Sequence, residues 1–215
     1  IRHIIRRERK YLETTINPDT NKPYLTPIKV VLFGEDENEA IQLSTHLSDA
    51  YDLAEEFSTL LGQRVKSSGF IKTMLLRRVC SSMLAGLNTG TKMLENWVSD
   101  DDEDDDDNDD GDNGIGDDSI FKNLTRDEIS CLERFVKILN EHKDKDPKYE
   151  LLRKILTEKL IVQPWIERGC IVFSQYYDTI KWVCERFAND FPNIKFGLYA
   201  GGDKSGIYEN GIYQR

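Results

Sequence analysis

A dense run of acidic residues limits how this chain can fold. Between Asp100 and Asp118 there are thirteen Asp or Glu residues and no Lys or Arg. Like charges at this density repel one another and cannot share a core, so we expect the run to be disordered. It divides the chain into a mostly helical part with one short strand (1–98), a disordered acidic insert (99–120) and a second folded part (121–215).

The net charge of the whole chain is misleading for the same reason. The 215 residues carry 39 acidic and 29 basic side chains, a net charge of −10, which normally argues against a nucleic-acid partner. Without the thirteen acids of the run, the chain has 26 acidic and 29 basic residues, a net charge of +3. The run itself fits a solvated spacer, a decoy that competes with phosphate for a basic face, or a docking tail for a basic partner.

We expect neither a membrane anchor nor a metal site. No apolar run approaches the roughly 18 to 20 residues of a spanning helix, and the N-terminus lacks the apolar region of a secretory signal. The chain also lacks an initiator Met, which suggests a piece of a longer protein. The four cysteines are scattered, which favours buried free thiols in a reducing cytoplasm, with a metal site or disulfides as the alternatives.

Apolar spacing predicts several helices before and after the acidic run. A basic helix is expected over residues 1–15, a strand over 28–33, and amphipathic helices over 37–61 and 70–97. Thr125 and Glu128 fit a capping box that starts a helix reaching about His142. Asp146-Pro147 predicts another helix, with Pro in its first turn, that ends near Leu160.

The last fifty residues have an α/β pattern. The continuous apolar run at 169–173 predicts a strand buried on both faces in a parallel sheet. A polar turn at 174–179, a helix and a second strand at 194–199 follow, and the second strand ends at Gly201-Gly202. In such sheets, the turns after the carboxyl ends of strands are where ligands bind.

These residues resemble a known family. The segment from Asp146-Pro147-Lys148 to Gly202, with its Ile171–Tyr176 and Leu198–Gly202 stretches, resembles the opening of the second RecA-like lobe of superfamily-two helicases. It looks most like the Swi/Snf-type, helicase-like ATPase branch. Arg6-Arg7 and Leu75-Leu76-Arg77-Arg78 with Ser81-Ser82 are similar to the helical connector between the two lobes in bacterial members.

The resemblance implies a fragment of an ATP-dependent DNA helicase or translocase. The fold would be a helical connector followed by the incomplete, P-loop NTPase-like second lobe. The chain shows no phosphate-binding loop and no Asp-Glu magnesium motif, so we expect no catalytic, cofactor-binding or metal-binding residue in it. ATP and Mg²⁺ would bind the intact parent, in which the first RecA-like lobe is the partner of this segment.

The resemblance also implies which residues meet nucleic acid. The turns after the two strands would face the DNA backbone, which makes Ser174, Gln175, Gly201, Gly202 and Lys204 candidates. The alternative is that Ser174 and Gln175 cap the next helix while the glycines only form a turn. Tyr176 and Tyr177 fit base stacking or packing between helix and sheet.

Arg77 and Arg78 are candidates for a phosphate clamp, for pairing with carboxylates of the first lobe, or for a solvated surface. Adjacent helical residues point about 100° apart, so the two cannot face one phosphate equally. For the chain as a whole, the alternative function is a non-enzymatic interaction module whose acidic segment binds basic proteins or mimics DNA.

Overall fold

The computed structural model describes residues 8–26, 32, 41, 44–95, 119–158 and 164–215. The chain forms two compact units, residues 1–40 and 41–215, which we describe separately. The described residues are mostly helical and include two small antiparallel sheets, so the fold is α/β only in the broad sense of containing both kinds of element. The acidic run lies outside the described residues, and its predicted disorder is not addressed by the structure.

The first unit contains a short helix and a hairpin. Helix α1 (Arg9–Thr14) is followed by strands β1 (Ile16–Asn17) and β2 (Lys22–Pro23), which pair antiparallel. The predicted helix over 1–15 is therefore described only in its second half. Residues 1–7, with Arg2, Arg6 and Arg7, and nearly all of the predicted strand at 28–33 lie outside the described residues.

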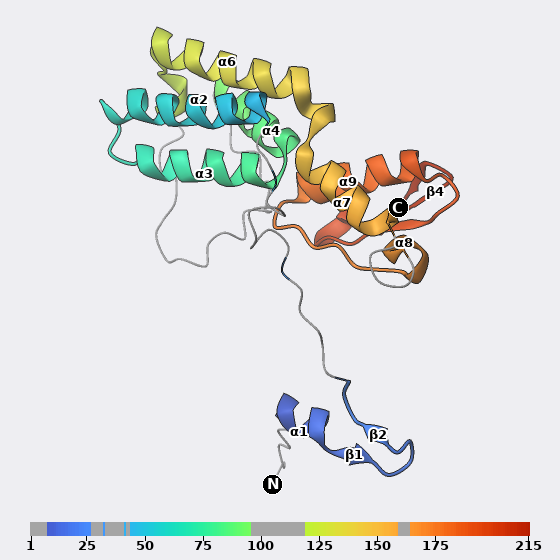
Figure 1. The fold of residues 1–215 in the computed structure, drawn as a ribbon. Coiled ribbons are helices and arrows are strands. Elements are labelled where there is room, and N and C mark those ends of the chain that lie inside the picture. The colour runs from blue at the N-terminus through green and yellow to red at the C-terminus, as the bar shows by residue number, and fades with distance from the viewer. Residues whose placement is uncertain (1–7, 27–31, 33–40, 42–43, 96–118, 159–163) are drawn as a thin grey trace. The chain divides into compact units, whose positions relative to one another are not determined.

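The second unit begins with a bundle of four helices around one apolar core (Figure 1). The helices are α2 (Thr45–Gly62), α3 (Ser68–Ser81), α4 (Met83–Leu94) and α6 (Arg126–His142), and a single turn of helix, α5 (Ser119–Lys122), precedes the last. Each contributes side chains that are almost fully buried, among them Phe57, Leu75, Met83 and Phe135. Helices from both sides of the acidic run thus share one core.

Two helix boundaries differ from the sequence-based predictions. The helix expected over 37–61 begins at Thr45, after an extended Ser44. The helix expected over 70–97 is two helices, because Ser82 is extended (φ −159°, ψ 156°) and its Oγ accepts a hydrogen bond from the Ala85 N–H at 3.1 Å. Ser82 is therefore the N-cap of α4, since a serine hydroxyl competes well for a free helical N–H.

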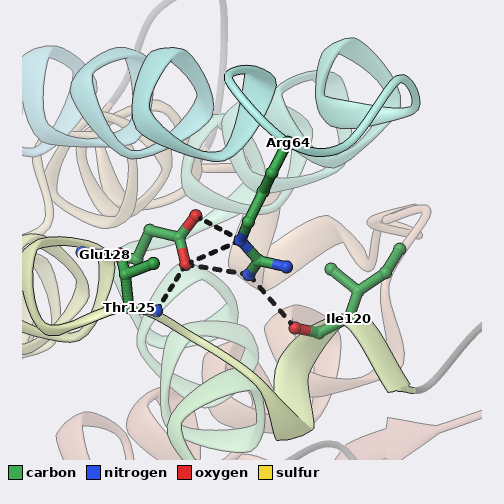
Figure 2. Close-up of polar contacts among 4 residues, drawn as sticks. All are labelled: Arg64, Ile120, Thr125 and Glu128. Carbon is green, nitrogen blue, oxygen red and sulfur yellow. Dashed lines mark hydrogen bonds and ion pairs between the residues drawn. The ribbon is translucent and has the colours of Figure 1, made fainter.

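The start of α6 is confirmed as a capping box and is tied to the rest of the bundle by an ion pair. The Thr125 N–H donates to Glu128 Oε2 at 2.7 Å, and the Glu128 N–H donates to Thr125 Oγ1 at 3.3 Å. The Arg64 guanidinium donates to both carboxylate oxygens of Glu128, at 2.9 and 2.8 Å, and to the Ile120 carbonyl (Figure 2). Burial opposes ionisation of Glu128, but the hydrogen bonds from Arg64 and Thr125 outweigh it and lower the pKa of this carboxyl.

After the bundle, the chain forms short helices and a three-stranded sheet (Figure 1). The helical elements are η1 (Lys143–Lys145), α7 (Pro147–Thr157), α8 (Trp165–Arg168), α9 (Tyr177–Asp190) and η2 (Gly202–Lys204). The predicted start of α7 is confirmed: Pro147 opens the helix and the Asp146 side chain caps it. The strands are β3 (Phe196–Leu198), β4 (Gly206–Glu209) and β5 (Ile212–Gln214).

The predicted parallel strand-helix-strand unit is not formed in the described residues. The stretch at 169–173 is not a strand, and β3, which occupies the second predicted strand, pairs antiparallel with β4. The sheet also contains a local hairpin that we did not predict: Asn210 (φ 53°) and Gly211 (φ 74°) form a two-residue turn between β4 and β5. Asn-Gly favours this turn because both positions need positive φ. Pairing of neighbouring segments also closes shorter loops than a parallel crossover does.

The expectation of buried free thiols holds for half of the cysteines. All four are free, but only Cys131 and Cys184 are buried, while Cys80 and Cys170 are exposed. Burial raises the pKa of the Cys131 and Cys184 thiols to about 11. Among the described helices, none combines the length and the apolar character that crossing a membrane requires.

Candidate nucleic-acid interface

A cleft of about 630 Å³ lies where the bundle meets the C-terminal part of the second unit. Its walls come from the end of α3, the first two turns of α7, the stretch from Val172 to Tyr176, and the first two turns of α9. Three of the predicted site residues line it, namely Arg77, Ser174 and Gln175. The fold therefore brings residues of the predicted connector next to residues of the turn after the first predicted strand.

A buried polar junction holds the walls of the cleft together. Asp146, only 3% exposed, accepts hydrogen bonds from the Met83 N–H at 2.8 Å and from the Lys148 N–H at 2.9 Å. One carboxylate thus satisfies the first free N–H of α4 and caps α7. Beside it, Thr179 Oγ1 of α9 lies 2.8 Å from the hydroxyls of both Ser81 and Ser82. The junction fixes the start of α9 to the break between α3 and α4.

Arg77 and Arg78 point to different surroundings. Arg77 is exposed and lines the cleft. Arg78 is half-buried, and its guanidinium carbon lies 4.2 Å from the centroid of the Tyr176 ring, a cation–π contact between the bundle and the turn before α9. Arg77 is thus placed to meet a ligand, whereas Arg78 is placed to position the turn.

The turn at 174–176 is held by its own hydrogen bonds. Ser174 Oγ accepts from the Tyr176 N–H and donates to the Tyr176 carbonyl, both at 3.3 Å. Ser174 thus orders the turn into α9, but the N-cap of α9 is Tyr176, whose own side chain makes no capping hydrogen bond. Tyr176 is 6% exposed, which agrees with packing and not with stacking on a base.

The remaining predicted site residues do not line the cleft. Gly201 and Gly202 follow β3, where the Ser205 hydroxyl donates to the Ala200 carbonyl at 2.7 Å and accepts from the Ala200 N–H at 3.0 Å. Lys204 Nζ lies 5.2 Å from the centroid of the Tyr177 ring. Tyr177 is the first residue of α9, and the first two turns of α9 also line the cleft. Lys204 therefore lies near the same end of α9 as the cleft.

Sequence reasoning missed Lys148 as a site residue. It is exposed, lies at the second position of α7 and lines the same cleft as Arg77. A signal was available: Lys148 is the basic residue of the Asp146-Pro147-Lys148 helix start that opens the stretch carrying the resemblance. The apolar part of the lining, which includes Leu152, Val172, Phe173 and Trp182, could not be assigned to one cleft from the sequence.

The charged lining of the cleft is positive. Arg77 and Lys148 contribute two cations, and neither has an ion-pair partner among the described residues. The one carboxylate in the lining, Asp146, is buried and engaged by two backbone N–H groups. Two available cations suit an anion such as a backbone phosphate.

Neither a metal-binding cluster among the described residues nor a related protein was found for comparison with the cleft. Within the ranges that the structure describes, no group of three or more His, Cys, Asp or Glu side chains is arranged to hold a metal ion. The chain matches no protein-family profile, no curated protein and no solved structure.

Proposed function

We propose that this chain is the inter-lobe helical connector and the opening of the second RecA-like lobe of a Swi/Snf-type helicase-like ATPase. In this proposal the chain contacts the DNA backbone without reading sequence and couples the two lobes of the motor. ATP and Mg²⁺ would be bound by the rest of the parent protein, including its first RecA-like lobe. The parent would be the enzyme, a helicase or translocase that hydrolyses ATP.

The observation that carries the proposal is the cleft itself. It gathers Arg77 of the connector-like helix and Ser174 of the turn that resembles the family's motif IV, two residues far apart in the sequence. Lys148, from the Asp-Pro-Lys helix start, adds a second cation. Such a set can hold a phosphate but offers nothing that distinguishes one base pair from another. That combination suits a motor that moves along any sequence.

The contact between connector and turn supports the coupling role. Arg78 stacks on Tyr176, and Ser81 and Ser82 hydrogen-bond to Thr179, so direct contacts join the end of α3 to the start of α9. A displacement of the connector would therefore be transmitted to the turn that holds the phosphate. Arg78 acts in this proposal as a positioning residue.

The parallel sheet of the lobe is also part of the proposal. Ile171 and Phe173, in the stretch predicted as a buried strand, are 79% and 88% exposed, and Tyr199, at the end of the second predicted strand, is 93% exposed. Large apolar side chains exposed to this degree support a lobe in which further strands cover them. In that lobe, the stretch at 169–173 would pair as a central strand.

The experiment is DNA binding by fluorescence anisotropy, with the full chain and a variant lacking residues 99–118. We expect both to bind duplexes of unrelated sequence equally, with affinity that falls as salt rises from about 50 to 200 mM. The deletion variant should bind more tightly, since thirteen negative charges are removed. Absence of DNA binding by both proteins, or strong preference for one sequence, would contradict the proposal.

A further inference from the structure

Two histidine rings join the start of α2 to the end of α6. His46, in the first turn of α2, stacks on His142, the last residue of α6, with ring centroids 4.4 Å apart and ring planes 8° apart. Both side chains are half-buried. His142 is followed directly by η1 and by the Asp146 cap of α7. The pair therefore lies at the point where the bundle continues into the C-terminal part.

Hydrogen bonds hold both rings in place. Ser44 Oγ lies 2.8 Å from His46 Nε2, and His142 Nδ1 lies 3.0 Å from the Ile138 carbonyl oxygen. A carbonyl only accepts, so Nδ1 of His142 carries a proton, and in the neutral ring Nε2 carries none. Two neutral rings can stack in this way without electrostatic penalty.

Positive charge is disfavoured at this place. Each His that gains a proton faces the other ring at van der Waals distance, and His46 lies at the positive end of an 18-residue helix. The charged or titratable groups that act on His46 are His142 of α6, Lys145 of η1 and Asp49 of α2. Two of these three can be cationic, and only Asp49 favours a charged imidazole.

The balance of these effects lowers the pKa of His46. Burial is the largest cause, and His142 and Lys145 act in the same direction. A backbone hydrogen bond at Lys145 and the Asp49 carboxylate oppose it. The folded chain therefore favours neutral His46 more strongly than the unfolded chain does.

We propose that the His46–His142 stack is an acid-released clasp, which holds the start of α2 against the end of α6 at neutral pH and opens when His46 gains a proton. The clasp rests on its own geometry and not on the proposed function. Its release frees the end of the bundle from which η1 leads into α7. It makes the joint between the bundle and the cleft sensitive to pH.

The sign of the pH dependence follows from linkage. His46 has a folded pKa below its ordinary value near 6.5, so the stability it contributes is present above pH 6.5 and is lost as pH falls below it. For each unit by which folding lowers the pKa, the equilibrium constant for opening rises by up to about tenfold at low pH.

The test is an NMR titration of His46 in the full chain, in a His3→Gln background so that only the two rings of the stack contribute histidine signals. We expect His46 to titrate below 6.5. We also expect amide protection at 47–50, corrected for the intrinsic pH dependence of exchange, to fall between about pH 7.5 and about pH 5.5. A His46 pKa at or above 6.5, or unchanged protection across this range, would overturn the proposal.

A His142→Phe variant supplies the matched control, because it keeps a flat ring against His46 but cannot take a charge. We expect the pKa of His46 to rise toward 6.5 in this variant and the loss of protection at low pH to shrink. The same loss of protection as in the parent chain would refute the clasp. Should the variant not fold, the titration of the unaltered pair still decides.

Discussion

The four-helix bundle and the C-terminal part of the second unit differ in how completely they bury their apolar residues. In the bundle, the periodic apolar positions of α2, α3, α4 and α6 meet in one core that includes fully buried Phe57 and Phe135. In the C-terminal part, two small clusters form around α9, while Ile171 and Phe173 are exposed.

The difference shows what an apolar pattern can and cannot predict. Amphipathic helices that follow one another in the sequence can bury their apolar faces against each other. The helices predicted from their apolar spacing are therefore observed in the structure. A strand buried on both faces needs partners from elsewhere, so its apolar run alone does not produce a strand. The predictions below test whether the bundle is the stable region and the C-terminal part the incomplete one.

The largest expected effect comes from truncating the same side chain in both regions. Phe135→Ala removes a fully buried ring from the bundle and should lower the free energy of unfolding by about 3–5 kcal/mol, measured by urea denaturation. Phe173→Ala, at a position 88% exposed, should change it by less than about 0.5 kcal/mol. Equal losses would mean that Phe173 is part of a core in solution.

The second comparison is between a buried and a half-buried carboxylate. Glu128 is 1% exposed and pairs with Arg64, whereas half-buried Glu209 of β4 pairs with exposed Lys195. Glu128→Gln should destabilise by about 1–3 kcal/mol at neutral pH, because the capping box and the Arg64 pair both lose their anion. Glu209→Gln should have an effect of less than about 1 kcal/mol.

The pH dependence of the same variant gives an independent check. The pKa of Glu128 is lowered in the folded chain, so the stability it provides is present above its ordinary value of 4.5 and is lost as pH falls below that value. The Glu128→Gln chain should therefore lose less stability on acidification than the parent chain. Parallel acid denaturation curves for the two would contradict the role assigned to the carboxylate.

An effect of similar size is expected from adding one methyl group to a glycine. A Cβ on Gly86 would overlap the Val79 side chain and approach Leu139, so Gly86→Ala should destabilise the bundle by about 1–3 kcal/mol. Gly197 in β3 has open space around the same position, so Gly197→Ala should be neutral or stabilise by up to about 1 kcal/mol. Thermal unfolding of the two variants measures the contrast, and the reverse order would show that the bundle is loosely packed.

Local signals in the sequence were sufficient for part of the fold. The capping box at Thr125 and Glu128 and the Asp146-Pro147 helix start were predicted correctly, because both depend on residues within one turn of each other. The same kind of signal was available but not used at Ser82, which ends one helix and caps the next, and at Asn210-Gly211, which makes a hairpin.

Features that depend on distant residues were not predictable in the same way. The apolar run at 169–173 carries no information about whether a partner strand is present. The grouping of Arg77 with Ser174 in one cleft follows from how α3 packs against the start of α9, through Thr179 and Ser82. No spacing in the sequence encodes that contact.

The central claim is that the cleft at Arg77 holds a DNA phosphate. The most direct measurement is the slope of the logarithm of DNA affinity against the logarithm of salt concentration, for the full chain, Arg77→Gln and Arg134→Gln. Arg134 is an exposed arginine of α6 that does not line the cleft, so it serves as the matched control. We predict that Arg77→Gln reduces the magnitude of the slope by about 0.9, the value for one lost phosphate contact, while Arg134→Gln leaves it unchanged. Equal slopes for all three proteins would contradict the account.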